Sequence, residues 1–152
     1  MIWKILDENI ERSNKLGKWI SPDVIDYTYW EVRYILPDKL SDITELINYI
    51  CDKHKINKDK LSQAEIISFF LFMKDSLVRI AEVEQGNLQP RVVNKSKFKP
   101  SPRAKDYPAI IELNRLSGGC PIKAKEIKEM KYSEVFETLL ALTIESEGTY
   151  DN

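Results

Sequence analysis

The chain has 152 residues, of which 43% are hydrophobic and 31% charged, and its net charge is −1. This composition is typical of a soluble, one-domain globular protein and excludes a globally disordered chain. The longest apolar run, residues 66–73, is far below the roughly 18 residues of a membrane-spanning helix, and the amino terminus lacks the apolar core of a secretion signal. Two cysteines are too few for a disulfide framework, so we predict a cytoplasmic protein.

The first two elements are predicted to be helices. Trp3, Leu6 and Ile10 recur at helical spacing, which predicts a helix over residues 2–16 that ends at Gly17. The next element, residues 24–36, follows a helix start signal at residues 21–23 (Ser-Pro-Asp). Its aromatic and β-branched content also suits a strand. The start signal favours a helix, which Pro37 is expected to close.

The next two helices carry clearer signals. Residues 41–54 have an apolar stripe with a period of 3.6 residues. Residues 62–65 (Ser-Gln-Ala-Glu) form a capping box, in which the serine and glutamate side chains satisfy free backbone N–H groups. We expect this second helix to run to Gln85, with Gly86 as its end. It is apolar almost all round in its first half, so we predict that it is central to the fold.

Residues 87–107 form a basic segment that we call the strap. Its residues 88–105 carry six Lys or Arg side chains, three prolines and no acid. Because the whole chain has a net charge of −1, the remaining residues sum to −7. The prolines exclude a continuous helix, and the low apolar content excludes an independent core.

Three short helices are predicted after the strap. Pro108 begins the first, which Gly118 or Gly119 ends, Pro121 begins the second and Ser133 the third. The sequence therefore predicts an all-α fold: a helical bundle over residues 1–86, the strap, and a carboxyl-terminal helical segment over residues 108–152. We expect the last segment to dock on the bundle or on a neighbouring copy.

The cysteines and the single histidine give weak catalytic and metal signals. Cys51 and His54 are three residues apart, but a structural zinc site needs about four such ligands, so we interpret them as core and helix-end residues. Cys120 is placed at a helix start, where a thiol can be activated, and His54 is the only histidine available as its base. A structural turn is the better interpretation. We predict no enzyme, no metal and no cofactor.

The strap is the strongest candidate for binding. Its cations could contact a protein, an acidic surface of this chain or of another copy, or the phosphates of a nucleic acid. We favour protein contact, since the strap has only one aromatic residue and the chain lacks the high pI of nucleic-acid binders. The alternative is a nucleic-acid-associated regulatory protein that binds through the basic strap residues 91–105. The predicted contact residues are the strap side chains and an aromatic group: Arg91, Lys95, Lys97, Phe98, Lys99, Arg103 and Lys105, with Tyr27, Tyr29, Trp30 and Tyr34.

Two stretches resemble a known class of proteins. Residues 122–142 and the central apolar run 66–84 are similar in pattern to helices of small bacteriophage tail proteins, tail assembly chaperones among them. The resemblance implies a non-catalytic helical protein that binds other virion or tape-measure components, can do so as a multimer, and is located in the host cytoplasm or the virion. It carries over no individual site residue.

Overall fold

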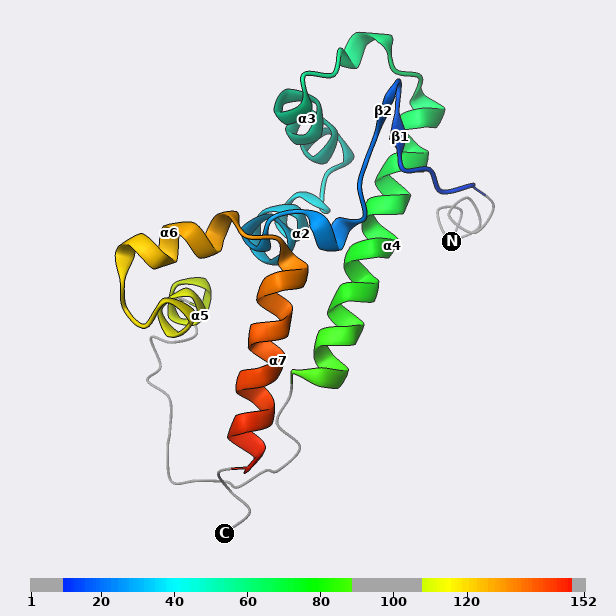
Figure 1. Cartoon of the computed structure of the whole chain (residues 1–152). Helices are drawn as coiled ribbons and strands as arrows, with labels where there is room; N and C mark the ends of the chain where they lie inside the picture. Colours follow the sequence, from blue (N-terminus) through cyan, green and yellow to red (C-terminus); the bar gives the residue numbers. More distant parts are fainter. Residues whose placement is uncertain (1–9, 89–107, 149–152) are drawn as a thin grey trace.

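The computed structural model describes residues 10–88 and 108–148, which are mainly helical (Figure 1). Among these residues, no helix combines the length and apolar character needed to cross a membrane. The predicted all-α class is confirmed, with a two-strand hairpin as an addition. In chain order, the elements are β1 (Lys15–Leu16), β2 (Trp19–Ile20), η1 (Val24–Asp26), η2 (Glu31–Ile35), α2 (Leu36–Lys39), α3 (Ile43–His54), η3 (Lys58–Lys60), α4 (Gln63–Asn87), α5 (Pro108–Ser117), α6 (Pro121–Glu129) and α7 (Tyr132–Gly148).

The predicted helix over residues 2–16 is wrong where the structure describes it. Residues 10–14 are not helical, and β1 pairs with β2 in an antiparallel hairpin. Gly17 is the first residue of the two-residue turn that connects β1 to β2, and its φ is +62°. Glycine adopts this positive φ without strain, and tight hairpin turns require it. Gly17 therefore turns the chain back on itself, where the sequence analysis expected it to end a helix. Trp3 and Leu6 lie outside the described residues.

Replacing Gly17 by alanine should lower the free energy of unfolding by roughly 1–2 kcal/mol, because a side chain at positive φ is strained. The new Cβ atom would also lie 3.3 Å from Cδ2 of Leu61. Gly86 is the matched control: it is helical and a Cβ there meets nothing within 4 Å. Gly86→Ala should raise stability by about 0.5–1 kcal/mol. Urea denaturation of both variants checks the contrast, and equal effects would contradict the assigned turn.

The predicted helix over residues 24–36 is divided in two. Asp23 caps the short η1 helix by accepting from the backbone N–H of Ile25 at 3.2 Å, and the chain is extended at Tyr27. A second start follows, because Thr28 and Glu31 form a capping box, with the Glu31 N–H donating to the threonine hydroxyl at 3.2 Å. Within residues 24–36, the β-type pairing is limited to Thr28, which forms an isolated antiparallel β-bridge with Lys131.

The second half of this segment winds as the π-helix η2 and continues into α2, so Pro37 does not close it. Pro37 lies in the first turn of α2, where a missing backbone N–H is tolerated. The predicted helices 41–54 and 62–85 are confirmed as α3 and α4. Ser62 caps α4 through the N–H of Glu65 at 3.2 Å, but α4 continues through Gly86 to Asn87.

The three predicted carboxyl-terminal helices are confirmed as α5, α6 and α7. Gly118 and Gly119, with φ of +60° and +79°, separate α5 from α6. α7 begins at Tyr132, one residue before the predicted start. Leu113, Tyr132 and Val135 from these helices belong to the same buried cluster as the side chains of α3 and α4. In Figure 1, α4 and α7 lie side by side and run in the same direction, while α5 and α6 lie on the other side of α7 from α4.

Candidate functional site

The last helix is apolar but only partly covered. Over residues 132–145, where side chains are described, the buried residues are Tyr132 and Val135, in the first turn, where α7 packs against η1. Further along, Phe136 and Leu140 are half-buried, and Ile144 is 58% exposed. A solvated helix normally places polar residues on its outer face. α7 instead presents a surface that is apolar beyond what the core uses.

One side of the space between α4 and α7 is an apolar groove of about 380 Å³. η1 contributes Ile25, α4 contributes Ile80 and Val83, and α7 contributes Tyr132 and Phe136. Val83 is 45% exposed, and Ile25 is similarly open. The charged side chains that line the groove are Arg79 and Glu137, with Ser133 beside them. We call this space the apolar groove.

The other side is a polar cleft of about 470 Å³ between α4, α5 and α7. Its charged residues are Arg33, Glu84, Glu112 and Arg115. The Arg33 guanidinium binds Glu84 through one nitrogen and Glu112 through another, the second at 2.5 Å. All three side chains are partly buried, with 18–22% of their surface exposed. Arg33 thus joins three separate elements, η2, α4 and α5.

Two tyrosines complete this network. The Tyr132 hydroxyl donates to Oε1 of Glu84 at 2.7 Å, and the Tyr29 hydroxyl donates to Oε1 of Glu112. Each oxygen of the two carboxylates therefore accepts a hydrogen bond from the protein. We call these five side chains the arginine clasp. Tyr132 links it to the groove, since the same residue lines the apolar side.

The electrostatics of the clasp raise the pKa values of its arginine and its two tyrosines. Burial alone would lower the pKa of Arg33, but the charges of Glu112 and Glu84 outweigh it and raise that pKa. Burial and the glutamate acceptors raise the pKa values of Tyr29 and Tyr132. The tyrosines therefore remain donors and the arginine remains charged at neutral pH. Such a fully hydrogen-bonded set is suited to holding helices together.

A second buried carboxylate supports the helix that carries Arg33. Glu31 is 3% exposed and accepts hydrogen bonds from Thr28, from the hydroxyl of Tyr49 at 2.7 Å and from the Lys53 ammonium. Burial alone would raise the pKa of Glu31, but these donors outweigh it, so that pKa lies below its usual range. Glu31 thereby fixes η2 to α3.

The strap cations and Phe98 lie outside the described residues, so binding through the strap stays a prediction. The aromatic group is divided. Tyr27 and Tyr29 are buried in the core, which removes their rings from the surface. Trp30 and Tyr34 are half-buried, with ring centroids 4.7 Å apart and the Lys128 ammonium 4.3 Å from the Trp30 centroid. Partner contact at Trp30 and Tyr34 stays a prediction.

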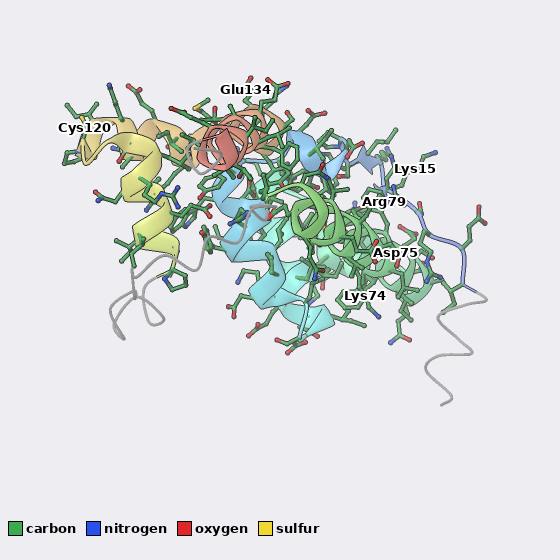
Figure 2. The ribbon with its side chains drawn as sticks, turned by 90° about the horizontal axis from the view of Figure 1, so that it is seen from below. Lys15, Lys74, Asp75, Arg79, Cys120 and Glu134 are labelled. Atoms are coloured by element: carbon green, nitrogen blue, oxygen red, sulfur yellow. The ribbon has the colours of Figure 1, made fainter. Side chains whose placement is uncertain are left out.

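The cysteines and the histidine lie on different parts of the fold. Cys51 is buried, and this burial raises the pKa of its thiol. The His54 ring stacks on the Trp19 ring, with the ring centroids 4.2 Å apart. Cys120 lies in the turn between α5 and α6, away from the end of α3 that carries His54 (Figures 1 and 2). The cysteine and its candidate base are therefore not brought together. In the described ranges, no group of three or more His, Cys, Asp or Glu side chains could hold a metal ion.

The sequence-based predictions included neither the clasp nor the groove. The clasp joins Arg33 to a carboxylate 79 positions away, and no local pattern marks such a pair. The groove had one available signal: residues 135–144 contain seven apolar residues and one acid, more than a single buried stripe requires. Comparison of this chain with protein-family models, with curated proteins and with solved structures gives no match.

Proposed function

We propose that this chain is a non-catalytic interaction protein that binds a protein partner of a larger assembly through the apolar groove. One observation carries the proposal: Ile25, Val83 and Phe136 from three elements line an apolar depression that the described part of the chain leaves open. Contiguous exposed apolar surface of this kind marks interaction sites in soluble proteins. A role in assembly also agrees with the resemblance of residues 66–84 and 122–142 to bacteriophage tail proteins.

The position of the groove supports a helical ligand. Two helices that lie side by side present a channel into which the apolar face of a third helix can insert. The clasp holds one wall in place, because Tyr132 lines the groove with its ring and binds Glu84 of α4 through its hydroxyl. A groove with fixed walls loses little conformational entropy when a partner binds.

Affinity capture with the tagged full chain tests the proposal, using extract of the cells that naturally produce it. Val83→Lys should abolish capture of the specific partner, because it places a charge on the apolar wall. Ile122→Lys is the matched control, since Ile122 is 71% exposed and lies on α6. A partner retained by the control and lost with Val83→Lys is the expected result. Capture that is unaffected by Val83→Lys would contradict the proposal.

A further inference from the structure

The charge around the apolar groove identifies the chemistry of its partner. α7 carries four glutamates and no Lys or Arg between residues 132 and 148. Glu134 and Glu137 are exposed on its first turns, and Glu82 is exposed on α4. Arg79 on α4 lines the groove, and Lys131 is exposed just before α7. Figure 2 shows Arg79 on α4, and Glu134 on the side of α7 that faces away from α4. The groove is thus apolar at its base, and its α7 wall contributes the acidic side chain of Glu137 from a helix that carries no cation.

The apolar surface continues along α7 at helical spacing. Phe136, Leu140 and Ile144 are four residues apart, so they form one stripe. From Phe136 to Ile144 this stripe is about 12 Å long at 1.5 Å per residue. A partner helix of roughly three turns would cover it. Glu137 lies beside the stripe, where the polar face of such a helix would lie.

We propose that the groove binds an amphipathic helix of a partner protein whose polar face is basic. This inference rests on the proposed function and specifies its ligand. Lys or Arg side chains on the partner would pair with Glu137, which lines the groove, while its apolar residues contact Val83, Phe136 and Leu140. A second copy of the same face is disfavoured, because it would bring two glutamate-rich α7 helices together.

Two synthetic helical peptides of about 18 residues, or five turns, provide the probe. Both carry leucines at i, i+3, i+4 and i+7, and the remaining positions combine alanine with lysine in one and with glutamate in the other. The full chain should bind the leucine–lysine peptide at least tenfold more tightly than the leucine–glutamate peptide, measured by fluorescence anisotropy. The preference should decrease as salt increases, because the flanking charges are exposed.

Charge reversal locates the interaction. Glu137→Lys should weaken binding of the basic peptide at least tenfold and strengthen binding of the acidic peptide. Glu126→Lys is the matched control, because Glu126 is exposed on α6, outside the groove. It makes the same change in net charge and should leave both affinities within about twofold. Equal effects of the two reversals would overturn the inference, since they would report net charge alone.

The remaining outcomes separate the two proposals. Absence of binding, or equal binding of both peptides, would overturn the basic-helix inference, whether another copy or this chain's own strap occupies the groove. If Val83→Lys still abolished capture of a partner in the extract, the proposed function would stand and only the ligand chemistry would be wrong. If Val83→Lys changed neither capture nor peptide binding, both proposals would fail.

Discussion

Replacing Arg33 by methionine is expected to lower the free energy of unfolding by about 3 kcal/mol. The substitution keeps a long side chain but leaves Glu84 and Glu112 facing each other without a cation, and breaking a buried pair in this way costs about 3–5 kcal/mol. The lower end applies, because all three side chains are partly exposed. Urea denaturation measures the change.

Arg115→Met is the matched control, since Arg115 lines the same polar cleft, is exposed, and forms no ion pair within the described ranges. It should change stability by less than about 0.5 kcal/mol. Neutralising the two carboxylates in the Arg33→Met background, as Glu84→Gln and Glu112→Gln, should recover part of the loss. An Arg33→Met chain as stable as the Arg115→Met chain would show that the clasp does not hold the helices together.

The second large effect is expected at Glu31. Glu31→Gln should lower the free energy of unfolding by about 2 kcal/mol at pH 7, because it removes the charge that donors from three residues contact. Lys53 is 40% exposed and can turn to solvent, which limits the cost. Glu82→Gln is the control, because Glu82 is exposed on α4; it should have little effect.

This loss should depend on pH in one direction. The pKa of Glu31 is lower in the folded chain than in the unfolded chain, so ionised Glu31 stabilises the fold above the unfolded value of about 4.3. That stabilisation decreases as the pH falls below this value toward the folded pKa. The difference in the free energy of unfolding between the natural chain and Glu31→Gln should be constant from roughly pH 6 to pH 8 and should shrink below about pH 4.5. Urea denaturation at each pH measures this difference. A difference that grows on acidification would contradict the assigned role.

The helices that the sequence predicted correctly have local signals. Ser62 and Glu65 mark the start of α4 within four residues, and Pro108 and Pro121 mark the starts of α5 and α6. These signals act between neighbours in the chain, so they need no knowledge of the tertiary fold.

The errors arose where two local signals compete or where distant segments decide. Gly17 can end a helix or turn a hairpin, and the contact of β1 with α4 selects the hairpin. The capping box from Thr28 to Glu31 was present in the sequence, but the earlier start signal at residues 21–23 obscured it. The clasp could not be predicted, because Arg33 meets Glu84 and Glu112 only after the chain has folded.

The clasp and the groove are two sides of one arrangement. On the polar side, Arg33 joins α4 to α5, and Tyr132 joins α7 to α4. On the apolar side, the same helices present Val83 and Phe136. Loss of the clasp should therefore weaken partner binding as well as stability, even though Arg33 does not line the groove.

The most direct test of the interaction surface is NMR mapping of amide shifts in the labelled full chain as the leucine–lysine peptide is added. We expect the largest shifts in residues 79–83 and 132–144, with α6 nearly unchanged. Shifts that cluster instead around Trp30 and Tyr34, or along α5 and α6, would place binding on another surface and contradict the assignment of the apolar groove as the partner site.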